Sequence, residues 1–90
     1  MKIFKPAVAG TLESSDAYIE ISPSENGITI ELESIVKQQF GASIEKAVLS
    51  TLSDLEIDNA LVHIIDRGAL ECVIRARVET AVIRGGNKDA

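Results

Sequence analysis

Aromatic residues and cysteines are scarce in this chain, and each shortage narrows what the chain can be. Only 3% of the 90 residues are aromatic and none is tryptophan, so isoleucine, valine, leucine and alanine must build the core. The single cysteine, Cys72, excludes a disulfide within the chain. A lone thiol is typical of a reducing compartment, and we therefore expect a cytoplasmic protein.

Long apolar runs are missing, and positive charge is in the minority. No stretch approaches the ~20 apolar residues that a membrane-spanning helix needs. No apolar segment follows Lys2 and Lys5, as it would in a secretory signal. Acidic residues outnumber basic ones by 14 to 9, which gives a formal net charge of −5. Such a charge disfavours nucleic acid and anionic membranes, so we expect neither as a partner.

What the chain does contain is ordinary for a globular protein, with 46% hydrophobic and 26% charged residues. This balance argues against disorder, and the length suits one modest hydrophobic core. We expect a single domain over residues 1–90, in which residues 1–12 and 85–90 are loosely ordered. Residues 1–12 have no period that distinguishes an extended edge from a loop.

Two segments alternate between apolar and polar residues and predict strands. In residues 17–22, Ile19 and Ile21 share one side, and in residues 28–33 the apolar residues occupy every even position. Residues 23–27 supply proline, serine, asparagine and glycine, which favour a turn. The two strands are therefore predicted to pair as an antiparallel hairpin.

Two further segments have the 3.6-residue period of amphipathic helices. The first begins at Ser34, a plausible N-cap, and ends near residues 54–56, while the second covers residues 69–84. A strand is predicted between them within residues 57–66, centred on residues 61–65. The expected fold is α+β and two-layered: an antiparallel-rich sheet with two helices packed on one face, in the order β-β-α-β-α. The predicted buried stripes are Val36, Phe40, Ile44, Ala47, Val48, Leu52 and Leu55 in the first helix and Leu70, Val73, Ile74, Ala81 and Val82 in the second.

A pair of serines gives the most unusual chemistry in the chain. Ser14 and Ser15 are adjacent, and the carboxylates of Glu13 and Asp16 flank them. Such residues favour a polar turn. A serine becomes a nucleophile only beside a base and an orienting group, and the sole histidine, His63, lies far away in the sequence. We therefore interpret the serines as accessible attachment points and expect no catalytic residue.

Three blocks of the chain resemble a known family in sequence, order and spacing. They are residues 9–16 (AGTLESSD), 34–41 (SIVKQQFG) and 66–79 (DRGALECVIRARVE). Over about residues 2–84 the chain is similar to the acyl carrier protein, or gamma chain, of citrate lyase. Three separate blocks are far more specific than one short motif.

That resemblance implies a covalent cofactor on Ser14. The group is 2'-(5''-phosphoribosyl)-3'-dephospho-coenzyme A, linked through a phosphodiester and holding the acyl group on its terminal thiol. Glu13, Ser15 and Asp16 would form the surface that the prosthetic-group transferase recognises. The resemblance also implies a non-catalytic subunit that serves the alpha subunit (citrate CoA-transferase) and the beta subunit (citryl-CoA lyase). The complex would cleave citrate to acetate and oxaloacetate.

Two other functions stay open at this point. The chain could be the acyl carrier of malonate decarboxylase or citramalate lyase, which would share the anchor and differ in partner. It could also be a small α+β ligand-binding or regulatory module without a covalent group, in which Ser14 stays unmodified.

His63 and two glutamates could form sites of other kinds. His63 could be a general base or a metal ligand, but no second histidine or cysteine lies at ligand spacing, so we expect a structural histidine and no metal site. Glu31 and Glu33 could pass for a carboxylate pair. A solvated strand face is the favoured interpretation of both.

Four arginines and the cysteine lie in the last third of the chain. The arginines could contact the cofactor's phosphates, because guanidinium binds phosphate with two hydrogen bonds. Pairs with Glu71 and Glu79 along the helix are the alternative. Cys72 could have a lowered thiol pKa at a helix start, although we expect it to pack in the core. The arginines are Arg67, Arg75, Arg77 and Arg84.

Overall fold

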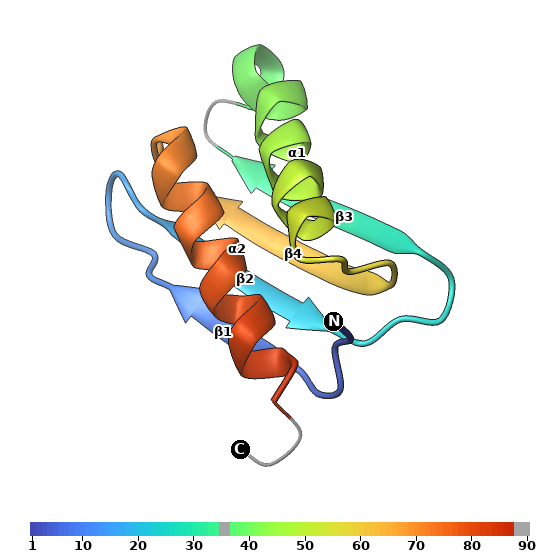
Figure 1. The fold of residues 1–90 in the computed structure, drawn as a ribbon. Coiled ribbons are helices and arrows are strands. Elements are labelled where there is room, and N and C mark those ends of the chain that lie inside the picture. Colours follow the sequence, from blue (N-terminus) through green and yellow to red (C-terminus); the bar gives the residue numbers. More distant parts are fainter. Residues whose placement is uncertain (35–36, 88–90) are drawn as a thin grey trace.

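The computed structural model describes residues 1–34 and 37–87, which form one mixed sheet and two helices (Figure 1). The elements are β1 (Ala7–Gly10), β2 (Ala17–Ser22), β3 (Ile28–Ser34), α1 (Lys37–Asp54), β4 (Ala60–Asp66) and α2 (Glu71–Gly85). The predicted α+β class is confirmed. The predicted order lacks β1, which adds a short strand where the sequence had no deciding period.

The strand order is β1-β2-β4-β3, and it shows that the predicted hairpin is wrong. β2 and β3 follow one another in the chain but lie on opposite sides of β4. β4 pairs antiparallel with β2 and parallel with β3. β1 pairs antiparallel with β2 and forms one edge of the sheet. The turn after β2 therefore spans the width of β4 and does not join neighbouring strands.

The parallel pair explains why the hairpin does not form. β3, α1 and β4 make one strand–helix–strand crossover, in which the helix carries the chain back so that β4 can run parallel to β3. In this register Ile30 lies opposite Val62 and Leu32 opposite Ile64. Alternation in the sequence identifies the two faces of a strand but does not identify its neighbours.

Both helices cover the same face of the sheet (Figure 1). α1 packs against α2 and β3, and α2 packs against β1 and β2. The inward side chains of the central strands, such as Ile19 and Ile64, are fully buried between the layers. The other face has no covering element among the described residues. It presents Val8, Tyr18 and His63, which are exposed or half-buried.

The start of each helix departs from the predicted pattern. Ser34, predicted as an N-cap, is the last residue of β3, and its hydroxyl donates a hydrogen bond to the Asp66 carboxylate at 2.8 Å. Phe40 and Leu70, predicted to be buried, are 51% and 71% exposed. The upper end of α1 projects beyond the strands in Figure 1, so its apolar stripe extends past the sheet. Val36 lies outside the described residues.

Described residues of both terminal segments contact the rest of the domain. Residues 1–12 contain β1 and the buried Ile3, and the Phe4 amide donates to the Gly85 carbonyl at 2.9 Å. Gly85 is the last residue of α2 and is buried, while residues 88–90 lie outside the described part of the chain. In the part of the chain that the structure describes, neither helix is long and apolar enough to cross a membrane.

Candidate functional site

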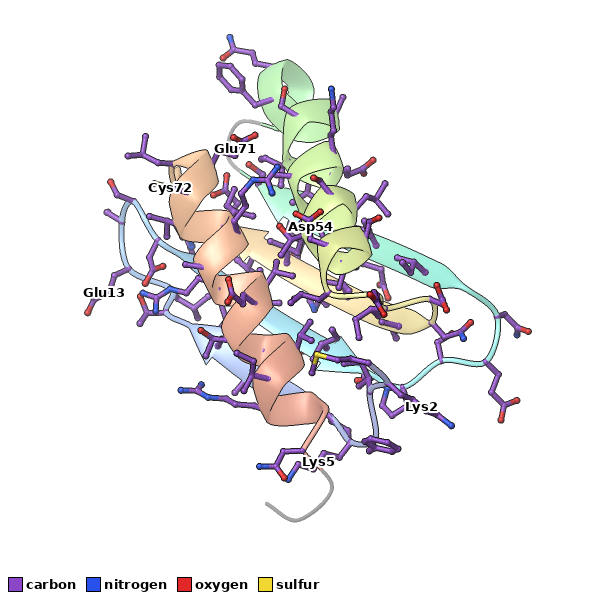
Figure 2. All side chains as sticks on the ribbon, viewed as in Figure 1. Lys2, Lys5, Glu13, Asp54, Glu71 and Cys72 are labelled. Carbon is purple, nitrogen blue, oxygen red and sulfur yellow. The ribbon has the colours of Figure 1, made fainter. Side chains whose placement is uncertain are left out.

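Ser14 lies in the loop between β1 and β2, at the end of the molecule where β4 also finishes and α2 begins (Figure 1). Glu13, Ser14 and Ser15 are exposed, and Figure 2 shows Glu13 pointing outward from the loop. The Ser14 hydroxyl has no hydrogen-bond partner among residues 1–34 and 37–87. It is therefore free to react without the loss of an internal contact.

The carboxylate of Asp16 holds this loop in shape. Its oxygens accept hydrogen bonds from the Thr11 hydroxyl at 2.6 Å and the Ala17 amide at 2.7 Å. Arg77, which belongs to α2, donates to both oxygens, from Nε at 3.0 Å and from Nη2 at 2.8 Å. The hydrogen bonds from Arg77, Thr11 and Ala17 stabilise the carboxylate and lower the pKa of Asp16 below its usual range. Asp16 is thus an ionised structural brace near neutral pH.

Backbone hydrogen bonds tie the same loop to the turn that follows β4. The Ser15 amide donates to the Arg67 carbonyl at 2.9 Å, and the Arg67 amide donates to the Asp16 carbonyl at 2.9 Å. Ser15 has a φ of 65°, in the left-handed region that residues other than glycine enter infrequently. Ser14 therefore stands at the outer end of a loop whose base is fixed on two sides.

Gly10 is required for the entry into the loop. Its φ is +93°, and a Cβ atom at this position would lie 1.8 Å from the carbonyl oxygen of Ala17. That oxygen belongs to the backbone of β2, so it cannot move aside as a flexible side chain would. The glycine before the serines is thus explained by close approach of two backbone segments.

The turn from β4 into α2 is organised by a buried carboxylate. Asp66 is 2% exposed, and its Oδ1 accepts from the Ala69 amide at 2.9 Å and the Gly68 amide at 3.2 Å. Its Oδ2 accepts from the Ser34 hydroxyl at 2.8 Å. This arrangement fixes the position of Arg67, whose backbone supports the serine loop.

The four arginines have four different roles, and only one makes the predicted pair within its helix. Arg75 lies 3.9 Å from Glu71, one helical turn away. Arg84 donates to the Val8 carbonyl at 2.8 Å, and Arg77 braces Asp16. Arg67 is exposed and its side chain has no partner in the described residues. Arg67 is consequently the guanidinium that is available near the serine loop.

His63 lies away from the serines, on the face of the sheet that no helix covers. Its Nε2 is 2.6 Å from the Glu33 carboxylate, and its Nδ1 is 3.6 Å from that of Glu20. The hydrogen bond to Glu33 and the two negative charges raise the pKa of His63. The structural role expected from the sequence stays a prediction, and the two glutamate partners were not predicted. The described ranges contain no cluster of acidic, histidine and cysteine side chains that could hold a metal ion.

Cys72 corrects one expectation. It is exposed in the first turn of α2, beside Glu71 in Figure 2, and does not pack in the core. The brace between Asp16 and Arg77 was also not predicted, because 61 residues separate the two in the sequence. One available signal was that Asp16, Asp66 and Arg77 all fall in the family-like blocks.

Comparison with known proteins decides the family. A family model described as Malonate decarboxylase delta subunit matches residues 4–85. The Citrate lyase acyl carrier protein 2 of Salmonella typhimurium is 58% identical over 89 residues, which cover 98% of this chain and 92% of that protein. The chain belongs to the citrate lyase acyl carrier protein family. Another member, from Escherichia fergusonii, is 55% identical over the same shares of the two chains.

A solved structure supports the architecture in a separate way. One chain of the Pseudomonas malonate decarboxylase hetero-tetramer in complex with malonate matches with a TM-score of 0.72. The match covers 93% of this chain and 91% of that chain, at 24% identity. At that identity the likeness concerns the fold alone, so it supports the mixed sheet and the two helices on one face.

Proposed function

We propose that this chain is the acyl carrier subunit of citrate lyase and that Ser14 carries its prosthetic group. The proposal is supported by two observations taken together, the identity of the chain to named relatives and the exposure of Ser14. Relatives named citrate lyase acyl carrier protein are 55% and 58% identical to the chain, and Ser14 is an exposed hydroxyl on a braced loop. The chain itself would catalyse no step and would hold the acyl group while other subunits perform the chemistry.

The residues around Ser14 fit a phosphodiester-linked group. The exposed hydroxyl can be esterified without breaking a hydrogen bond to the described residues. Arg77 already neutralises the carboxylate of Asp16, which reduces its repulsion of an added phosphate. Arg67 on the adjoining turn is available to pair with that phosphate. When bound, 2'-(5''-phosphoribosyl)-3'-dephospho-coenzyme A supplies a thiol that holds the acyl group as a thioester.

Covalent attachment of the acyl group to the carrier explains how a subunit without catalytic residues would contribute to the reaction. A covalently attached acyl group meets each active site at a high effective concentration, because the encounter becomes intramolecular. The partners would be the alpha subunit (citrate CoA-transferase) and the beta subunit (citryl-CoA lyase), which together convert citrate to acetate and oxaloacetate. The exposed Glu13 and Ser15, with Asp16 behind them, would be recognised by the prosthetic-group transferase. One free cysteine suits the cytoplasm as the site of this assembly.

The acyl carrier of malonate decarboxylase is the second candidate. The matching family model has that enzyme's name, and a chain of its hetero-tetramer has a similar fold. The identity to that chain is 24%, against 58% to the Salmonella typhimurium citrate lyase carrier. This difference favours citrate lyase.

Intact-mass measurement on the chain purified from its native host grown on citrate tests the proposal. We expect an added mass larger than phosphopantetheine, which peptide mapping places on Ser14. The Ser14→Ala variant should lose the addition completely and keep its fold by circular dichroism. Ser15→Ala is the matched control and should still be loaded. An addition that persists in Ser14→Ala and disappears in Ser15→Ala would move the anchor to the neighbouring serine.

A further inference from the structure

An apolar cleft lies at the same end of the molecule as Ser14. Its volume is about 410 Å³, and it is bounded by the beginning of α1, the beginning of α2 and the turn between β4 and α2. The side chains that line it are mostly apolar: Phe40, Ile44, Ala47, Ala69, Leu70 and Ile74. The exposure of Phe40 and Leu70, which departs from helix periodicity, occurs at this cleft. Two large apolar side chains left open to water beside a cleft indicate a binding surface.

The cleft is next to the attachment loop through the backbone. The Ser15 amide is hydrogen-bonded to the Arg67 carbonyl, and Gly68, the residue after Arg67, lines the cleft. Ser14 is the residue before Ser15. Consecutive Cα atoms are about 3.8 Å apart, so only a few residue lengths separate Ser14 from the cleft. A group attached to Ser14 has this cleft within its reach.

We infer that this cleft is the resting site of the pantetheine arm of the prosthetic group on Ser14, an inference that rests on the proposed function. The arm is joined to Ser14 through the phosphoribosyl and nucleotide parts of the group, so it reaches the cleft by folding back toward the domain. The arm is a chain of methylene groups interrupted by two amides, so it presents both apolar surface and a few polar atoms. The apolar walls suit the methylene groups. The Ser43 hydroxyl on the α1 side has no partner in the described residues and is available to an amide.

A second hollow does not fit this arm. Its volume is about 910 Å³, and it lies at the opposite ends of β2 and β4. Residues 1–4 and 23–26 line much of it, together with Asp58 and Asn59. Its walls include charged side chains such as Lys2 and Glu25. This hollow therefore lies at the end of the sheet opposite to Ser14. Its charged walls also suit methylene groups poorly.

Charge decides which form of the arm can rest in the cleft. Among the residues that the structure describes, the titratable side chains lining the cleft are Asp66 and Glu71, and both are acidic. The oxygens of Asp66 accept hydrogen bonds from Ser34, Gly68 and Ala69, and a carboxylate has no proton to donate to an anion. An arm that ends in a thiol or a neutral acyl group is accepted, whereas a carboxylate at its end is repelled and desolvated at a cost. The cleft thus holds the arm in its neutral states and leaves an anionic acyl group outside.

The test compares two caps of nearly equal size on the arm of the loaded protein. Cys72→Ser removes the exposed cysteine, and the thiol of the arm is then alkylated with either iodoacetamide or iodoacetate. Amide and methyl NMR spectra are compared with those of Ser14→Ala in the same background. With the neutral cap we expect shifts at residues 68–71 and at Ile44 and Ile74. With the charged cap these shifts should become much smaller.

Two helix variants supply the control. Ser43→Trp fills the cleft from an exposed position on its wall and should abolish the shifts at residues 68–71. Ala42→Trp places the same ring at an exposed position that does not line the cleft and should keep them. Circular dichroism checks that both variants fold.

Each other outcome overturns a defined part of the inference. Shifts confined to residues 11–16 with both caps would mean that the arm stays in solvent, and the resting site would be rejected. Shifts that survive Ser43→Trp unchanged would reject it as well. Equal shifts at the cleft with the two caps would reject the selection by charge. A chain without added mass at Ser14 would instead overturn the proposed function on which the inference rests.

Discussion

The two ends of the sheet hold their connections in different ways. At one end, the loop with Ser14 is braced by the ion pair of Asp16 with Arg77, which joins segments 61 residues apart. At the other end, neutral groups hold the turn between β2 and β3. The Gly27 amide donates to the Asn59 side chain at 2.8 Å, and its carbonyl accepts from the Ala60 amide at 3.0 Å. The serine loop is thus held by an ion pair, whereas the two contacts of Gly27 are made between neutral groups.

The difference shows how a loop can expose a hydroxyl to solvent while its own backbone is held in one conformation. Every strong contact in the serine loop is made by its base, through Thr11, Asp16 and the backbone of Ser15, while Ser14 itself is left free. A loop that is already ordered loses less conformational entropy when a modifying enzyme binds it. The braced end is therefore suited to repeated recognition by several partner proteins, which a carrier requires.

The largest expected effect comes from a pair of glycines, one at each end. Gly10 and Gly27 have φ values of +93° and +87°, so alanine is strained at both positions. No atom lies within 4 Å of a Cβ placed on Gly27, whereas one on Gly10 would be 1.8 Å from the Ala17 carbonyl. We expect Gly27→Ala to lower the free energy of unfolding by about 1–2 kcal/mol. Gly10→Ala adds the cost of displacing backbone, for a loss of about 2–5 kcal/mol.

Urea denaturation of the two variants measures this difference directly. The loss should be larger at Gly10, and loading of Ser14 by the transferase should slow in that variant alone. Equal losses for the two substitutions would show that the serine loop tolerates movement of β2. The comparison between a fixed end and an ordinary turn would then fail.

Much of the fold was predictable because it depends on patterns that are local in the sequence. Alternation gave β2 and β3 and the 3.6-residue period gave both helices, since each pattern reports which side of an element is buried. The pairing of strands was predicted wrongly, because the insertion of β4 between β2 and β3 depends on the crossover through α1. No local pattern contains that information.

The features of the candidate site likewise fall into those that were predictable from the sequence and those that were not. The exposure of Ser14 and its position before a strand followed from the sequence, and the family resemblance named it as the anchor. The roles of Arg77 and Arg67 did not follow, because they depend on where α2 and its preceding turn are placed in space. The predicted burial of Leu70 was wrong for a related reason. An apolar stripe on a helix is buried only where a neighbouring layer of the fold lies against it.

An intermediate effect is expected when the brace itself is weakened. Asp16→Asn removes the negative charge but keeps the size of the side chain. One of the two hydrogen bonds from Arg77 then loses its acceptor, because an NH2 group replaces one oxygen, and the other loses its charge assistance. We expect the Ser15 and Ala17 amides to exchange with deuterium about tenfold faster, because local opening becomes easier. Asn59→Ala is the control at the other end and should speed exchange at Gly27 without affecting the serine loop.

Acid provides a second measurement on the same variant. The folded-state pKa of Asp16 lies below its ordinary value of 3.8, so the carboxylate stabilises the fold at pH values above 3.8. That contribution is lost as the pH falls below 3.8 toward the lowered pKa. The stability difference between the native chain and Asp16→Asn should therefore be constant near neutrality and shrink below about pH 4. A difference that does not change with acid would show that the charge of Asp16 contributes nothing.

The smallest effect on the free energy of unfolding is expected from His63. It pairs with glutamates on the open face of the sheet, between the two ends, and holds neither the serine loop nor the turn between β2 and β3. It faces Glu20 on β2 and Glu31 and Glu33 on β3, and its side chain is 33% exposed. Because its pKa is raised above 6.5, protonated His63 stabilises the fold fully below that pH, and the stabilisation is lost as the pH rises through the raised value. Solvent screening limits it to less than about 1 kcal/mol.

His63→Gln should therefore lower the free energy of unfolding slightly at pH 5 and by less at pH 8. Amide exchange in the serine loop should stay as it is in the native chain, since the residue makes no contact with Asp16 or Arg77 among its hydrogen bonds and ion pairs. Faster exchange at Ser15 in this variant would mean that the open sheet face is coupled to the loop. The protection of the serine loop from exchange would then depend on the whole sheet and not on the ion pair of Asp16 with Arg77 alone.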